Sequence, residues 1–157
     1  MKGRVIYKDT MLYVSALIIH VISVVIWIGG VAFVTMITFP MIQRAENSLE
    51  EVFMFQGVEH RFSKIAKVFV VLTGLSGLYL IFEKGLSPGV WIMIMLWTVY
   101  AALLFGLEKL IFKKLFSQKP GTQYDTKKIF AVLQTFHWFV LILSFFAIAA
   151  GIWTAHY

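Results

Sequence analysis

Four long apolar stretches, separated by polar connections, dominate the pattern of the chain. They cover residues 11–39, 62–82, 90–107 and 129–154. A helix needs about 20 apolar residues to cross the hydrocarbon of a bilayer, where backbone polar groups must be satisfied within helices or closed barrels. These stretches are continuously apolar and do not alternate as barrel strands do, so they predict helices. The predicted fold is an all-α integral membrane protein, a four-helix bundle of up-down topology formed by a single transmembrane domain over residues 1–157.

Polar and turn-forming residues predict where these helices begin and end. The first stretch stops at Pro40 and is longer than the apolar core of a signal peptide, so we expect it to be retained. Ser48 and Glu51 have the spacing of a capping box, which predicts a helix that either continues into the second stretch or breaks near Gly57. The sequence "SPG" at residues 87–89 opens the third stretch.

Composition narrows the class of protein and its partners. The chain is 60% hydrophobic and 14% charged, against about 25% charged in an ordinary soluble domain. The excess apolar surface is expected to face a lipid bilayer. The absence of cysteine excludes disulfides, iron–sulfur clusters and thiolate-bound zinc. The net charge is +6, and the basic residues that produce it lie beside the apolar stretches. We therefore expect contact with anionic lipid head groups and no nucleic acid.

The distribution of basic residues predicts the orientation in the membrane. With four spans, both termini and the turn at 83–89 share one side, which holds Lys2, Arg4, Lys8 and Lys84. The two longer connections and the span ends beside them hold the remaining lysines and arginines. Basic segments are retained in the cytoplasm, so both termini are predicted to lie outside it, in a bacterial inner membrane.

Two histidines lie inside predicted spans. His20, within "IIHVISVVIWIGG", shares a helix face with Ser23 and Trp27, and His137 shares one with Ser144. Small and polar residues on one stripe mark the side that faces other helices. Ionisable residues inside the bilayer are candidates for function, although a hydrogen bond to a serine or a backbone carbonyl explains a buried imidazole equally well.

The second and third spans carry weaker signals. Counting by sevens places His60, Lys67 and Gly74 on one face of the second span, with His60 at its cytoplasmic boundary. Met93 and Met95 are two residues apart, so they face different directions and do not form a copper-binding pair.

The first half of the chain carries a family resemblance. "HVISVVIWIGG" resembles the first helix of the CopD-like and HemJ-like membrane proteins, and "VEHRFSKIAKVFVVLTGLSGLYL" at 58–80 is similar to a HemJ-type stretch with a Glu-x-Arg element. The resemblance implies b-type haem, because the first-helix histidine of the HemJ type matches His20. HemJ-type proteins are protoporphyrinogen oxidases, and the CopD-like relatives are linked to copper uptake. The third span departs from the HemJ pattern, with Met95 and Gly106 where a lysine and a histidine are expected.

These observations predict a membrane protein that binds haem b and takes part in electron transfer, linked to quinone or to other subunits of a redox complex or a homo-oligomer. His20 and His137 are the predicted axial ligands of one or two haems, since a four-helix bundle holds a porphyrin between its helices. His60 would assist and Trp27 would line the site. Arg61, Lys64 or Lys67 would pair with a propionate. Helical rise places His20 about 15 Å and His137 about 27 Å from the outer end, which favours two haems over one shared iron. The alternatives are a HemJ-like protoporphyrinogen oxidase, a CopD-like copper transport protein and a cofactor-free structural subunit; no catalytic residue is assigned.

Overall fold

The computed structural model describes residues 2–44, 49–107 and 126–156, and these residues are helical almost throughout. No strand is present among them. The chain therefore has the predicted all-α architecture, with four helical stretches long and apolar enough to cross a membrane: Thr10–Ile42, Gly57–Lys84, Pro88–Gly106 and Phe130–Thr154. The elements are α1 (Lys2–Phe33), η1 (Val34–Thr38), α2 (Phe39–Arg44), α3 (Leu49–Lys84), α4 (Pro88–Ala102), η2 (Leu103–Leu107) and α6 (Thr126–His156), where η denotes a π-helical turn.

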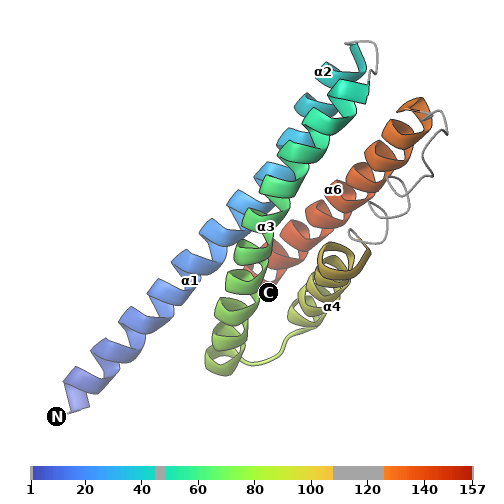
Figure 1. Ribbon diagram of the computed structural model, residues 1–157. Helices are drawn as coiled ribbons and strands as arrows, with labels where there is room; N and C mark the ends of the chain where they lie inside the picture. Colours follow the sequence, from blue (N-terminus) through green and yellow to red (C-terminus); the bar gives the residue numbers. More distant parts are fainter. Residues whose placement is uncertain (1, 45–48, 108–125, 157) are drawn as a thin grey trace.

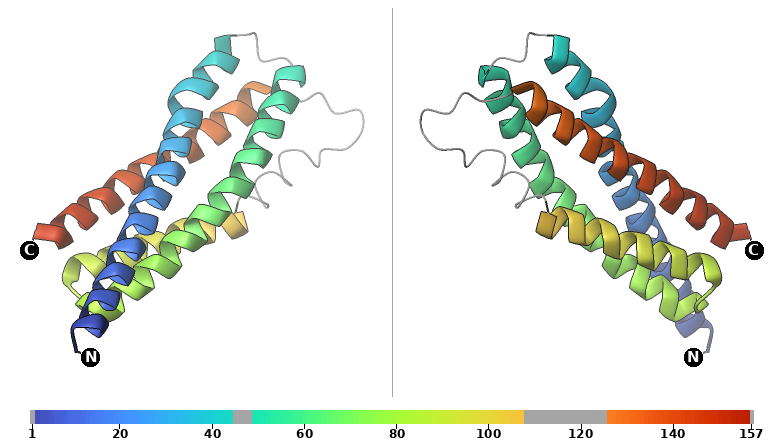
Figure 2. Two further views of the ribbon diagram at one scale, coloured as in Figure 1. Left: turned by 90° about the vertical axis from the view of Figure 1, so that its left-hand side faces the viewer. Right: turned by 90° about the vertical axis from the view of Figure 1, so that its right-hand side faces the viewer.

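The helices run alternately up and down and are arranged as two pairs (Figure 1). Helix α1 packs along α3, and α4 packs along α6, so the tightest contacts are within each pair. The two ends of the chain lie towards the end of the bundle where α3 turns into α4 (Figures 1 and 2). This arrangement confirms the predicted up-down bundle.

The first helical stretch continues through Pro40, where the sequence predicted its end. Proline has no backbone N–H and is tolerated only in the first turn of a helix. The π-helical turn η1, at Val34–Thr38, lies directly before α2, so Pro40 is the second residue of α2. The extra residue in the π turn resets the hydrogen-bond register, and the chain passes the proline without leaving the helical path.

Helix α3 is longer than the predicted second span, because it begins at Leu49 and passes unbroken through Gly57. Ser48 of the predicted capping box lies outside the described residues. The helix ends at Gly85, whose φ of 84° is favourable for glycine and whose N–H bonds to the carbonyl of Ile81 at 2.7 Å. Ser87 then caps α4 by accepting from the N–H of Val90 at 3.3 Å.

The two pairs meet in a small apolar core. Its buried members are Trp27, Ile28, Val31, Val70, Tyr100, Val140 and Leu141. Most other large apolar side chains are exposed; Phe82 and Phe146, for example, are 79% and 63% exposed. An exposed apolar surface of this extent is stable only against lipid or another apolar partner, as expected for a membrane protein.

The inward face of α3 is one residue away from the predicted one. Gly74 faces α4, as expected, but His60 is exposed and Glu59 is buried in its place. Between Glu59 and Gly74 the buried residues of α3 are Ser63, Ala66, Val70 and Thr73. The buried residues Glu59, Ala66 and Thr73 also repeat by sevens. The predicted period is therefore right, and the predicted face is displaced by one residue because it was counted from half-buried Gly74.

We expect Gly74→Leu to lower the free energy of unfolding by about 1–3 kcal/mol, the usual cost of overpacking. A Cβ at this position would lie 2.5 Å from Cζ2 of Trp97, and Trp97 is fixed by a 3.0 Å hydrogen bond from its indole N–H to the carbonyl of Val70. Gly57→Leu, in the same helix, is the matched control because a Cβ there meets no atom within 4 Å. Leu75→Ala, at a side chain that is 62% exposed, should also be mild. Thermal unfolding in detergent measures all three variants; equal losses at positions 74 and 57 would contradict this packing.

Candidate functional site

Two helices bring a buried carboxylate and a buried imidazole together. Glu59 of α3 and His137 of α6 are 6% and 4% exposed, and Oε2 of Glu59 lies 3.3 Å from Nε2 of His137. The other ring nitrogen, Nδ1, lies 2.9 Å from the carbonyl oxygen of Leu133, one turn earlier in α6. The rings of Phe39 and Phe136 meet the imidazole edge to face, at centroid distances of 5.0 and 5.6 Å. The imidazole of His137 is therefore contacted by its own helix α6, by Glu59 of α3 and by two aromatic rings.

A small cavity of about 30 Å³ adjoins this pair. It is lined by Val31, Glu59, Phe62, Ser63, Tyr100, Leu103, Leu104, Phe136, His137 and Val140. A space of this size holds one or two water molecules when polar groups line it. Both π-helical turns of the described chain are close by, since Leu103 and Leu104 begin η2 and Val31 precedes η1 by one turn. Turns of this kind are frequent at functional sites.

His20 lies half-buried at the interface of α1 and α3. Its Nδ1 is 3.0 Å from the carbonyl oxygen of Thr73 and 3.2 Å from the hydroxyl of Ser76. Ser76 donates its own proton to the carbonyl of Leu72 at 2.6 Å, so its oxygen can only accept from the imidazole. Both contacts therefore require a proton on Nδ1, and in the neutral ring the lone pair lies on Nε2.

Two buried polar groups of the described residues have no hydrogen-bond partner, the indole N–H of Trp27 and the hydroxyl of Thr73. Trp27 is seven residues beyond His20, about 10 Å of helical rise, and its ring packs T-shaped against Tyr100 at a centroid distance of 4.0 Å. Thr73 lies beside His20, which its carbonyl contacts. Buried polar groups are nearly always satisfied, so the hydroxyl of Thr73 would stabilise a water or a ligand there.

The structure does not bring the two predicted histidine ligands together. Their contacts on α3, at Thr73 and Glu59, are 14 residues apart, which corresponds to about 21 Å of helical rise. A single iron shared by His20 and His137 does not fit this separation. Both ring nitrogens of His137 already have hydrogen-bond partners, and the adjoining cavity is far smaller than a porphyrin. The described contacts leave Nε2 of His20 without a hydrogen-bond partner, whereas both ring nitrogens of His137 are engaged.

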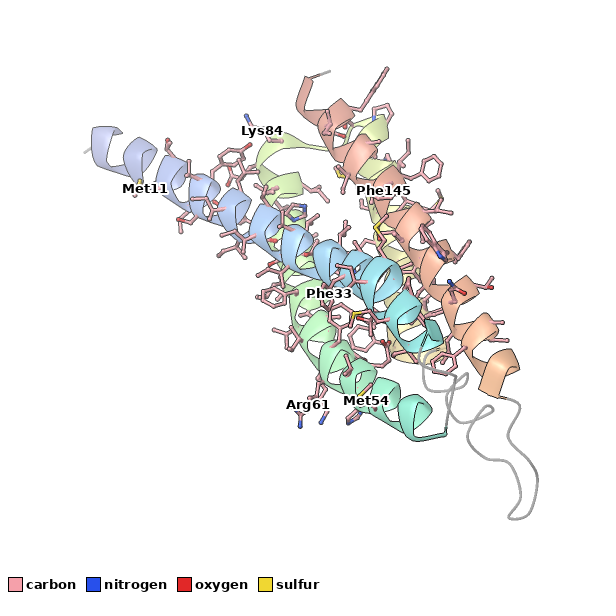
Figure 3. All side chains as sticks on the ribbon, turned by 90° about the horizontal axis from the view of Figure 1, so that it is seen from above. Met11, Phe33, Met54, Arg61, Lys84 and Phe145 are labelled. Carbon is pink, nitrogen blue, oxygen red and sulfur yellow. The ribbon has the colours of Figure 1, made fainter. Side chains whose placement is uncertain are left out.

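The remaining predicted site residues lie on the outside. His60 and Arg61 are exposed on α3, and Arg61 extends away from the bundle (Figure 3). The described residues contain no cluster of three or more histidine, aspartate or glutamate side chains that would bind a metal.

Sequence reasoning missed Glu59, Thr73 and Ser76. A signal for Glu59 was present, because it is the glutamate of the Glu-x-Arg element and has helical spacing from Ser63, although it lies three residues before the predicted span. Its partner is 78 residues away in the chain, and spacing alone does not reveal such a pair. No family model matches this chain, and neither the curated proteins nor the solved structures contain a match.

We expect Glu59→Leu and His137→Leu each to lower the free energy of unfolding by about 1–3 kcal/mol, because each leaves a buried polar partner without its hydrogen bond. The double variant should lose less than the sum of the two, since it leaves neither group unpaired. His60→Leu, at the exposed neighbour of Glu59, serves as the control. Unfolding in denaturant measures the four proteins, and strictly additive losses would show that the two side chains are not coupled.

Proposed function

We propose that this membrane protein binds b-type haem through Nε2 of His20 and takes part in electron transfer. The observation that carries the proposal is the fixed tautomer of His20, whose Nδ1 proton is held by Thr73 and Ser76 while Nε2 keeps its lone pair. Histidines that bind metals typically donate their second ring N–H to a carbonyl or carboxylate in this way. The resemblance of residues 18–30 to the HemJ-type first helix supports the same assignment.

The residues around His20 have distinct parts in this proposal. Thr73 and Ser76 orient the ring and raise the basicity of Nε2. Gly77 gives the imidazole room, since a Cβ there would lie 3.1 Å from Cε1 of His20. The unpartnered hydroxyl of Thr73 offers a hydrogen bond beside the imidazole. When bound, haem would supply one-electron redox chemistry.

The proposal places the protein in a bacterial inner membrane, with a quinone or another subunit of a redox complex as its electron partner. The exposed apolar sides of all four spans support contact with a lipid-soluble molecule or with a second membrane protein. The proposal uses one haem, at His20, because the surroundings of His137 offer no free ring nitrogen.

We expect His20→Ala to remove most of the haem bound by the purified protein, because it removes the axial ligand. His60→Ala is the matched control, since this histidine is exposed and should leave the spectrum unchanged. The measurement is the oxidised and dithionite-reduced absorption spectrum, together with the ratio of haem to protein. A His20→Ala protein with full haem content and an unaltered Soret band would reduce His20 to a packing residue and favour the cofactor-free alternative.

We also expect both termini on the non-cytoplasmic side of the membrane. The up-down arrangement places the two ends towards the same end of the bundle (Figure 2), and the basic connections are expected to stay in the cytoplasm. Reporters of the two compartments, fused in turn to the C-terminus, measure this orientation. Activity of the cytoplasmic reporter alone would reverse it.

A further inference from the structure

The contacts of His137 determine how many protons the buried pair holds. The carbonyl of Leu133 has no proton to give, so Nδ1 of His137 must donate to it. The contact between Nε2 and Oε2 of Glu59, at 3.3 Å, then requires one further proton between the two atoms. That proton belongs either to an imidazolium facing a carboxylate or to a carboxylic acid facing a neutral imidazole. In both forms the pair is neutral overall, and the two forms differ only by transfer of the proton.

The surroundings make this pair sensitive to protonation. Phe39 packs on the imidazole from α2, and Val31, Leu103 and Val140 line the adjoining cavity from α1, η2 and α6. Tyr100 of α4 is the other titratable group among the described residues that line the cavity, and apart from the pair these contribute no charged side chain. The nearby His60 and Arg61 are exposed on α3. An unpaired charge in such surroundings is costly. Gain or loss of a proton by one group of the pair is therefore expected to change the protonation of the other.

The position of the pair gives it a route to water. Glu59 lies beside His60, Arg61 and Lys64, which are exposed on α3. Charged side chains on the outside of a spanning helix are expected at the membrane boundary, where they reach water. The cavity beside the pair has room for one or two waters, so we expect it to exchange protons with the aqueous phase on this side.

We propose that Glu59, His137 and the water-sized cavity form a proton-exchange site that takes up and releases protons at this end of the membrane. In the charged form, a hydronium ion in the cavity protonates the Glu59 carboxylate. One O–H bond breaks in the donor and one forms on Glu59, so no oxidant or reductant is consumed. In the release step, the Glu59 acid returns its proton to a cavity water, and the Nε2 proton of His137 then passes to the carboxylate, so the pair ends neutral with the shared proton on Glu59. The inference is independent of haem, because neither group contacts His20.

The wild-type protein in lipid nanodiscs provides the first test. Infrared spectra between about pH 4 and pH 9, a range that covers carboxyl and imidazole titration, should contain a carboxylic acid C=O band that changes with pH. Nitrogen-15 spectra of histidine-labelled protein should record one imidazole that changes at the same pH. Glu59→Gln should remove the carboxyl band, and Glu83→Gln, at an exposed glutamate, should keep it. His20→Ala should also keep it, which separates this inference from the proposal on haem.

The cavity has a test of its own. Val140→Phe places a larger side chain into the lining, whereas Val132→Phe makes the same change at an exposed position of α6. After transfer into D2O, the Glu59 band of Val140→Phe should exchange at least several-fold more slowly than that of wild type or Val132→Phe. Equal exchange in the folded variants would overturn the role of the cavity. If Val140→Phe does not fold, the wild-type titration decides. A carboxyl band and an imidazole signal that both stay constant between about pH 4 and pH 9 would make the pair a static contact and overturn the proposal.

Discussion

Hydrocarbon offers no hydrogen-bonding partners, and this constraint decides where the polar side chains of the four spans lie. Many hydroxyls solve the problem locally by donating to the carbonyl four residues earlier. This holds for Thr35, Ser76, Thr98, Thr135, Ser144 and Thr154. An imidazole has two nitrogens on opposite sides of its ring, so one turn of its own helix does not satisfy both. His137 uses the carbonyl of Leu133 for one nitrogen and reaches across to Glu59 for the other. The histidines therefore join helices, and among these six hydroxyls that of Ser76 takes part in such a contact by accepting from His20.

Helix α3 supplies the partners of both histidines, at two different depths. Thr73 and Ser76 meet His20 of α1, and Glu59 meets His137 of α6. Buried Ala66 and Val70 lie between these levels. The bundle thus has two polar layers separated by an apolar one, and the proposed electron site and proton site belong to different layers.

Much of the fold followed from the sequence, because long apolar runs leave a spanning chain few alternatives. Span count, helical class and up-down order depend on hydrophobicity and length alone, and Ser87 and Gly85 follow local rules for helix ends. The site was less accessible. The choice between Glu59 and His60 depends on which of two adjacent stripes of α3 faces the bundle. Both stripes repeat by sevens, so the period alone does not decide between them. The partnership of Glu59 with His137 depends on how two helices far apart in the chain cross, and local spacing carries no information about that.

The π-helical turn at Val34–Thr38 also sets the angular phase of everything that follows it in the first helical stretch. One residue of an α-helix corresponds to about 100° of rotation. The extra residue in η1 therefore turns the segment from Phe39 onward relative to the regular helix before it. In this phase Phe39 is fully buried, with its ring against both Phe130 and His137. If the same residues continued as a regular α-helix without the π turn, Phe39 would lie about 100° further round the helix than it does, away from this position beside Phe130 and His137. The aromatic wall of His137 is thus a property of the π turn as much as of residue type.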